Sequence, residues 1–438
     1  MAGHIPTSDS SYDPGIPRAY AWIVFALTFG LLVSDYMSRQ VLNAVFPLLK
    51  EEWHLSDEQL GSLSGVVALM VGLLTVPLSL IADKWGRVRS LTVMAILWSI
   101  ATLACGLARN FEEMFAARFL VGVGEAAYGS VGIAVVISVF PSSMRATLAS
   151  AFMAGGMLGS VLGVWSGGMV AGAYGWRAAF FAMAAFGLFL ALLYPIIVRT
   201  SKMVPRAVLG GSAPEAVGKE RRSRPLLSLV SSPSVVLTYV GSGLQLFIGA
   251  ALMSWLPSFL NRYHAMPVDR AASAAAAFIL CAGIGMVACG VISDRLSRKD
   301  PRRAASFAVF ICITTFVLLS AGFRLPPGPG QLALIAAGLF LTSGTAGPSS
   351  AMVANLTHMA VHGSAFAVLT LVNNFLGLAP GPYITGILAD RYGLDSALSL
   401  ICLVSLASTL VFMLVRMLYA GDLSKASEFS GVAVRIPA

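Results

Sequence analysis

The stretch Ser34-Asp-Tyr-Met-Ser-Arg-Gln40 places an acid and a base inside a long apolar segment. Asp35 and Arg39 are four residues apart, so a helix brings them within reach of each other. A second apolar segment carries Arg118 and Glu125, seven residues apart and therefore also on one helical face. A charge at the centre of a bilayer costs from about 3 to more than 10 kcal/mol. If these segments cross a membrane, the four groups must face a polar cavity or one another.

Two interpretations of these charges are open. In the first, each helix carries an ion pair that only holds helices together. In the second, the charges form a proton and anion site. Burial raises the pKa of a carboxyl and a neighbouring arginine lowers it, so an exchange of partners loads and releases a proton. We favour the second, because an apolar side chain at any of the four positions would avoid the free-energy cost of a charge inside the bilayer. It predicts proton coupling at Glu125 and Asp35, and an arginine fork at Arg39 or Arg118 that holds a substrate carboxylate or phosphate.

The composition places these segments in a bilayer. Of the 438 residues, 57% are apolar and only 11% are charged, and the mean hydropathy is +0.81. A soluble protein carries about 25% charged residues. Crossing a membrane takes about 20 apolar residues as a helix, so we predict an all-α membrane protein with twelve spans. These are 19–49, 57–82, 89–108, 112–139, 147–173, 177–198, 234–260, 271–293, 303–322, 331–358, 363–388 and 395–418.

The basic residues predict the orientation. Twelve spans put both termini on one side. Of the 29 Lys and Arg, 20 lie in segments on the side of the termini and 7 lie opposite, the other two being Arg39 and Arg118. Because basic loops stay in the cytoplasm during insertion, we expect both termini to be cytoplasmic and the protein to lie in the cell (inner) membrane. The net charge of +9 is then a topology signal, and a nucleic-acid partner is not indicated.

The chain also contains an internal duplication. Its longest polar interval divides it into two halves in which Pro47 corresponds to Pro257, and Tyr174-Gly175 corresponds to Tyr392-Gly393. Duplication of this kind builds many secondary transporters, whose substrate site lies near the midplane between the halves. The predicted regions are an N-terminal tail (1–18), a six-helix bundle (19–198), a basic linker (199–233), a second six-helix bundle (234–418) and a C-terminal tail (419–438).

The twelve spans, the basic linker and a repeated loop resemble the major facilitator superfamily. The loop reads SLIADKWGR at 79–87 and GVISDRLSR at 290–298. Within the superfamily, three motifs look most like the spinster branch: YMSR at 36–39, RFLVGVGEAAY at 118–128 and NNFLGLAPGP at 373–382. The organic-anion and sugar-acid symporters share much of the sequence of these motifs. The resemblance implies alternating access, in which two bundles rock about a central site. One departure is Ser38, where the family has an acid, so either Asp35 takes over that role or Glu125 carries the proton alone.

Two further sets of residues complete the predicted sites. Polar side chains that can orient a substrate, or simply bond between helices, are Ser38, Tyr128, Gln245, Asn373 and Asn374. The resemblance to the superfamily implies that the repeated loops form a latch, in which acids and bases pair across the two bundles and close the cytoplasmic side. Its residues here would be Asp83, Lys84, Arg87, Asp294, Arg295 and Arg298.

The function we expect is secondary active transport driven by a proton gradient, without a cofactor or a metal. There is no metalloprotease, nucleophile-elbow or phosphate-loop motif, so an enzyme is not indicated. Four charges in one half of the chain do not line a channel. The resemblance to spinster proteins implies an amphipathic substrate such as a lysolipid or sphingolipid. The alternatives are a symporter of a small organic anion or sugar acid, and a non-transporting membrane lipid sensor. We expect a monomer whose partners are this small substrate and the bilayer.

Overall fold

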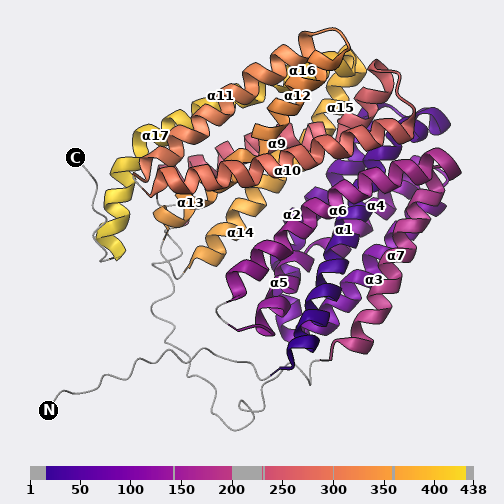
Figure 1. Ribbon diagram of the computed structural model, residues 1–438, viewed down its shortest axis with the longest axis horizontal. Coiled ribbons are helices and arrows are strands. Elements are labelled where there is room, and N and C mark those ends of the chain that lie inside the picture. Colours follow the sequence, from indigo (N-terminus) through magenta and orange to yellow (C-terminus); the bar gives the residue numbers. More distant parts are fainter. Residues whose placement is uncertain are drawn as a thin grey trace.

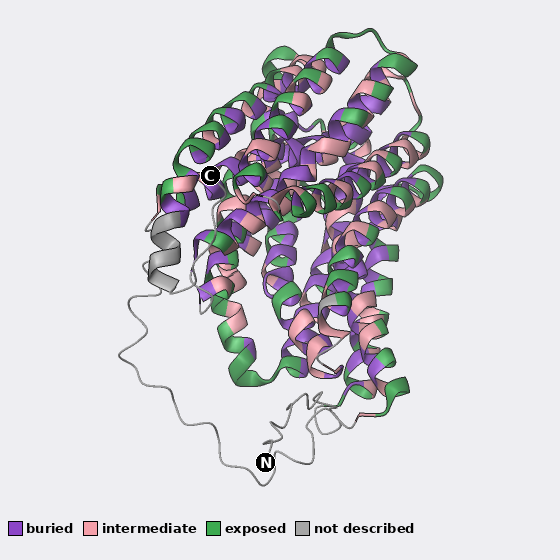
Figure 2. Cartoon of the chain, turned by 60° about the vertical axis from the view of Figure 1, so that its left-hand side comes forward, coloured by how far each residue is buried: buried purple, intermediate pink, exposed green. Residues whose placement is uncertain are grey.

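The computed structural model describes residues 16–141, 144–199, 229, 232–298, 300–357 and 361–430, and within these ranges the chain is helical and contains no strand. Twelve helical spans are long and apolar enough to cross a membrane, which confirms the predicted number. Exposed residues run along the outer surfaces of the helices (Figure 2). Many of them are apolar, such as Leu192, Val287 and Leu410 at 59%, 64% and 63% exposure. A bilayer is the solvent that such a surface requires.

The spans form two bundles, coloured indigo to magenta and rose to yellow in Figure 1. The N-terminal bundle consists of α1 (Arg18–Trp53), α2 (Asp57–Trp85), α3 (Arg87–Leu107), α4 (Phe111–Glu125) with α5 (Tyr128–Ser138), α6 (Arg145–Tyr174) and α7 (Trp176–Ile197). The C-terminal bundle consists of α9 (Pro233–Tyr263), α10 (Val268–Ser297), α11 (Arg302–Arg324), α12 (Pro329–Thr342) with η5 (Ser343–Thr345) and α13 (Ala346–Leu356), α14 (His362–Asn373) with η7 (Asn374–Leu378) and α15 (Pro380–Tyr392), and α16 (Leu394–Ile401) with α17 (Leu403–Ser430).

Corresponding helices of the two bundles end in the same way. α6 ends at Tyr174 and α15 ends at Tyr392, and each is followed by a glycine with a positive φ, 86° at Gly175 and 84° at Gly393. The N–H of each glycine donates to the carbonyl four residues earlier at 2.9 Å. Glycine adopts this conformation without the steric cost that a side chain would add. The repeated Tyr-Gly pair is thus a repeated helix stop.

The last helix extends beyond the predicted span. The apolar pattern ends near residue 418, but α17 continues to Ser430. The carboxylate of Asp422 accepts hydrogen bonds from the backbone N–H of Ser234 at 3.0 Å and from the Ser232 hydroxyl at 3.1 Å. It thereby caps the first turn of α9, where a negative charge is favourable. Tyr419 and Leu423 also pack into the core, at 0% and 4% exposure. The helix therefore continues beyond the apolar window through contacts with other helices, which hydropathy along the chain does not register.

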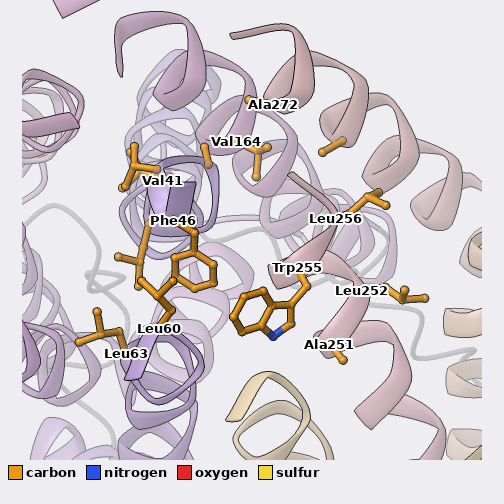
Figure 3. Packing of buried hydrophobic residues seen from close by; sticks show 14 of the residues in the cluster. Val41, Phe46, Leu60, Leu63, Val164, Ala251, Leu252, Trp255, Leu256 and Ala272 are labelled. Carbon is orange, nitrogen blue, oxygen red and sulfur yellow. The ribbon is translucent and has the colours of Figure 1, made fainter. Parts of the chain in front are cut away.

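The bundles meet at one end and diverge towards the other (Figure 1). We call the end with Trp53, Asp57 and Tyr392 the distal face, and the end where α1 begins and α7 stops the terminal face. Near the distal face, Phe46 of α1 lies against Trp255 of α9, with ring centroids 5.2 Å apart (Figure 3).

Pairs of small residues bring the bundles close together. On α2, a Cβ at Gly65 would lie 2.5 Å from the Ala379 carbonyl oxygen, and a Cβ at Gly72 would lie 2.9 Å from the Asn374 side chain. Beyond Gly72 the next turns of α2 expose Val76 and Leu80 at 50% and 61%. The bundles are therefore closed over the distal half of α2 and apart over its terminal half.

Candidate functional site

An ion pair between α1 and α4 is the centre of the candidate site. Arg39 donates from Nε and Nη2 to the same oxygen of Glu125, Oε2, at 3.0 and 2.8 Å. The Glu125 side chain is fully buried, whereas the Arg39 side chain keeps 18% of its surface exposed. No salt bridge joins Asp35 to Arg39, or Arg118 to Glu125, in the part of the chain that the structure describes. The pairs expected within each helix are replaced by one pair between helices.

A break in the fourth span positions Glu125. α4 ends at Glu125 and α5 begins three residues later, at Tyr128. The interruption frees the carbonyl of Ala126, which accepts a hydrogen bond from the Thr75 hydroxyl of α2 at 2.7 Å. Inside a bilayer a broken helix is tolerated only where such a group is satisfied again. The acid therefore lies where α4 is interrupted and α2 supplies the missing donor.

Asp35 lies beside this pair. It is 3% exposed, and its carboxyl interacts with that of Glu125. One oxygen of each carboxyl, Asp35 Oδ1 and Glu125 Oε1, is buried without a protein partner, as are the hydroxyls of Ser34 and Ser38. Buried polar atoms of this kind are usually bonded to water. With Arg118 close by, two carboxyls and two guanidiniums form one buried cluster whose net charge is zero when all four are ionised.

Arg118 bonds to backbone carbonyls in this conformation, and its predicted contact with a substrate stays a prediction. It is 1% exposed, and it donates to three backbone carbonyls: Nε to Leu63 at 3.2 Å, Nη1 to Ser38 at 3.1 Å and Nη2 to Arg39 at 3.1 Å. These bonds tie α4 to α1 and α2. In this conformation Arg118 does not face an open space, so it is not placed as a substrate clamp. Its spacing from Glu125 could not reveal these carbonyl partners.

Two of the predicted substrate residues are buried inside a bundle. Tyr128 is 0% exposed, and its hydroxyl donates to the Thr28 carbonyl at 2.7 Å. Gln245 is also 0% exposed, and its Oε1 accepts a hydrogen bond from the Ser405 hydroxyl at 2.9 Å. Both side chains make bonds between helices, and neither lines a space between the bundles in this conformation. In this conformation both side chains fit the alternative in which they only form hydrogen bonds between helices.

The two asparagines lie at a π-helical turn in the eleventh span. η7 runs from Asn374 to Leu378, between α14 and α15. Asn374 is 3% exposed and donates from Nδ2 to the Thr370 carbonyl at 2.8 Å. Asn373 is partly exposed, and its Oδ1 has no protein partner. π-turns inside helices are frequent at functional sites, and this one faces α2 across the bundle interface at Gly72.

The predicted latch residues lie apart at the terminal face. Asp83 and Arg87 approach each other at 3.8 Å within the N-terminal bundle, with exposed fractions of 65% and 48%. Among the described residues no ion pair joins the two repeated loops. The divergence of the bundles separates them here, so their role as a latch stays a prediction. The remaining predicted members, Lys84, Asp294, Arg295 and Arg298, are all exposed.

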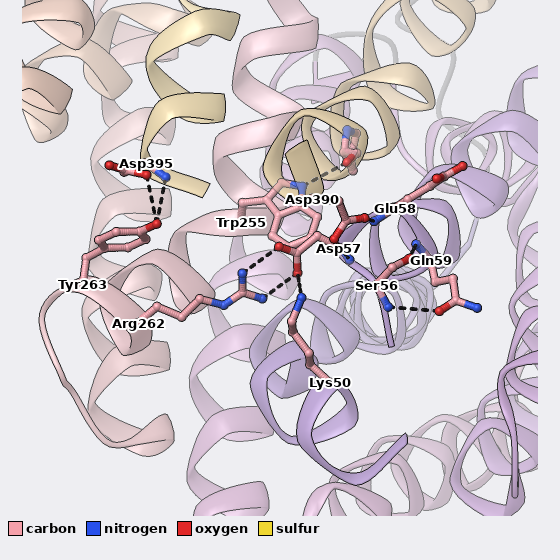
Figure 4. A network of polar contacts seen from close by, with 11 residues as sticks. Lys50, Ser56, Asp57, Glu58, Gln59, Trp255, Arg262, Tyr263, Asp390 and Asp395 are labelled. Atoms are coloured by element: carbon pink, nitrogen blue, oxygen red, sulfur yellow. Dashed lines mark hydrogen bonds and ion pairs between the residues drawn. The ribbon is translucent and has the colours of Figure 1, made fainter. Parts of the chain in front are cut away.

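A second polar network, which the sequence analysis missed, joins the bundles at the distal face (Figure 4). Asp57 accepts two hydrogen bonds from Arg262 at 2.7 and 2.8 Å and one from Lys50 at 2.6 Å. The carboxylate of Asp390 in turn accepts from the backbone N–H groups of Asp57 and Glu58, both at 2.8 Å. We call these five residues the distal latch. The acids at the start of α2 were visible in the sequence, but their partners depend on how the bundles are docked.

Known proteins resemble the chain over most of its length. The hexuronate transporter of Bacillus subtilis (strain 168) is 24% identical over 401 residues, which cover 90% of this chain and 94% of the relative. Protein spinster homolog 1 of Xenopus laevis is 26% identical over 400 residues, 86% of this chain and 74% of the relative. Neither of these relatives is named as a lipid sensor, so that alternative gains no support.

A solved structure also matches the fold of this chain. A bacterial homologue of the human lysosomal transporter Spinster, solved in an inward-facing and unoccupied conformation, covers 93% of this chain and 99% of its own with a TM-score of 0.83, at 20% identity. The family model of the Major Facilitator Superfamily matches residues 28–382. Two six-helix bundles and the match of the family model over most of the chain lead to one conclusion: the chain belongs to the Major Facilitator Superfamily, and it is similar to spinster proteins and to a hexuronate transporter.

Proposed function

We propose that this protein is a proton-coupled transporter that moves an amphipathic or anionic substrate, such as a lysolipid or sphingolipid, by alternating access. The single observation that carries the proposal is the Arg39–Glu125 pair with Asp35 beside it. Of the four charges within the spans, Arg39 has the largest exposed fraction, 18%, whereas the others are between 0% and 3% exposed.

The proton step follows from charge balance. With both carboxyls ionised, Asp35 and Glu125 are balanced by Arg39 and Arg118. An anionic substrate adds a negative charge to this low-dielectric interior, which is unfavourable unless one carboxyl takes up a proton. A substrate that engages Arg39 also weakens its pairing with Glu125 and favours uptake of that proton. Substrate binding and protonation are thereby linked at one guanidinium.

The substrate class follows from what surrounds Arg39. Its Nη1 makes no hydrogen bond among those found in the described residues, so it can donate to a carboxylate or phosphate. The C-terminal bundle offers little polar surface opposite, because Gln245 and Asn374 are buried and Asn373 alone of the predicted set is partly exposed. One anion-binding group in largely apolar surroundings suits a lipid with a charged head. A sugar acid would require more hydrogen-bonding groups.

We infer the orientation from the basic residues. The terminal face carries the excess of Lys and Arg, and this excess marks the cytoplasmic side. The protein then lies in the cell (inner) membrane with both termini in the cytoplasm. On this assignment the described conformation is open to the cytoplasm, and the loops that carry Asp83 and Asp294 close it when the bundles rock.

The test is transport into proteoliposomes with and without an imposed pH gradient, with a fluorescent lysolipid and a radiolabelled hexuronate as probes. We expect lysolipid movement to respond to the gradient, and the response to disappear in Glu125→Gln. Glu112→Gln is the matched control, because Glu112 is an exposed acid in the first turn of the same helix. A full gradient response in folded Glu125→Gln would contradict the proton assignment.

The second candidate substrate is a small organic anion or sugar acid. The hexuronate transporter relative and the free Nη1 of Arg39 favour it. The same assay separates the candidates, because hexuronate movement with inert lysolipid would identify the sugar-acid class. Arg39 would then be the group that binds the carboxylate, and Arg39→Lys would raise the KM by about tenfold because a bidentate contact is lost.

A further inference from the structure

A groove opens on the outer side of the N-terminal bundle at the terminal face. Neither Arg39 nor Glu125 lines it. It lies between the first turns of α3 and the last residues of α7 and has a volume of about 370 Å³. Its lining residues are Val88, Arg89, Thr92, Val93, Pro195, Val198 and Arg199.

The groove carries two positive charges that no carboxylate of the described residues neutralises. Arg89 and Arg199 are exposed, and neither forms a salt bridge within the described residues. The nearby acid Asp83 pairs instead with Arg87 at 3.8 Å. Arg199 is held at the rim, since its backbone N–H donates to the Tyr20 hydroxyl at 3.0 Å. The Arg199 Nε donates to the Ile196 carbonyl at 3.4 Å, but neither guanidinium is paired with a carboxylate of the described residues. Two guanidinium groups thus line one hollow with their charges unpaired there.

The rest of the groove is apolar and continues into the bilayer-facing surface. Val88 and Val198 form a buried wall, at 8% and 1% exposure. Towards the bilayer centre, α3 exposes Val93 at 48% and α7 exposes Ile196 and Leu192 at 64% and 59%. The groove therefore has a charged rim at the level of the helix ends and an apolar side along two helices.

We propose that this groove binds an anionic phospholipid, with its phosphate between Arg89 and Arg199 and an acyl chain along the exposed side of α3 and α7. The planar guanidinium fork matches phosphate oxygens. Basic pockets between membrane helices bind anionic head groups in this way. A free phosphate ion would use the arginines but not the apolar wall, so the combination selects a lipid. The site is separate from the transport site and does not depend on the proposed substrate.

The experiment is native mass spectrometry of the full chain released from nanodiscs that contain equal amounts of phosphatidylglycerol and phosphatidylcholine. We expect phosphatidylglycerol to be retained, and the Arg89→Gln/Arg199→Gln double variant to bind it about 30-fold more weakly. Arg302→Gln/Arg303→Gln is the matched control. It removes the same charge from an exposed pair at the start of α11, and it should retain the lipid as the unaltered protein does.

Three results would overturn the proposal. The first is equal retention of the two lipids by the unaltered protein. The second is an equal loss of phosphatidylglycerol in the control and in the double variant, which would mean a general effect of charge. The third is displacement of the lipid by millimolar inorganic phosphate, which would identify an ion site. Melting curves of the variants establish that each is folded, so a lost lipid reports on the groove.

Discussion

Replacing Arg262 by glutamine should shift the protein towards a conformation that is open at the distal face. Arg262 is the residue of the C-terminal bundle that contacts the Asp57 side chain in the distal latch, through two hydrogen bonds of 2.7 and 2.8 Å. The Asp57 side chain is 5% exposed and that of Arg262 is 24% exposed. In the alternating-access mechanism proposed above, the distal face separates in the opposite state, where these bonds are already absent. The substitution therefore destabilises only the described conformation.

The size of the shift follows from these contacts. A hydrogen bond to a charged group contributes about 1.5 to 3 kcal/mol. Because Arg262 is partly exposed and Lys50, which bonds Asp57 at 2.6 Å, is kept in the variant, we expect the low end, about 2 kcal/mol for the whole contact. That corresponds to a change of about 30-fold in the ratio of the two conformations.

Double electron–electron resonance measures this ratio directly. Spin labels at Arg109 and Pro327, exposed on distal loops of opposite bundles, report the separation of the distal face. The long-distance population should grow in Arg262→Gln. Arg270→Gln is the control, because Arg270 is an exposed arginine nearby that forms no salt bridge among the described residues. If the distances in Arg262→Gln match those in the control, the distal latch does not stabilise this conformation.

Three further variants test the assignment of the interior residues. Arg118→Gln should lower the free energy of unfolding by about 2 to 4 kcal/mol, because three buried carbonyls lose their donor; an unchanged melting temperature would contradict this. Gly65→Ala sets a methyl against the Ala379 carbonyl and should open the distal face in the same resonance assay, whereas Gly129→Ala, with no atom within 4 Å, should not. Tyr128→Phe should lower the free energy of unfolding by about 1 kcal/mol and retain transport. Loss of transport in this variant would indicate that Tyr128 contacts the substrate.

Hydropathy and charge predicted the architecture well because each span must satisfy its backbone internally and hide its polar groups from lipid. The same local rule predicted α17 poorly, since Asp422 extends it through a contact with α9 that lies far away in sequence. For the site, the sequence analysis singled out four charges, whose part in transport stays a prediction, but it did not identify their partners. Arg39 binds Glu125 across two helices, and Arg118 binds carbonyls.

The amino-acid sequence by itself determined that the chain spans a bilayer twelve times, that its halves are repeats, and that its costly charges are concentrated in the first and fourth spans. These properties depend on composition and on helical periodicity, which are local. Only the tertiary structure decided which acid meets which base. That choice depends on the rotation of each helix and on the docking of one bundle against the other, as the bond between Asp57 and Arg262 shows. Residues 205 positions apart become neighbours there, because packing of the whole bundles, and not the spacing along the chain, brings them together.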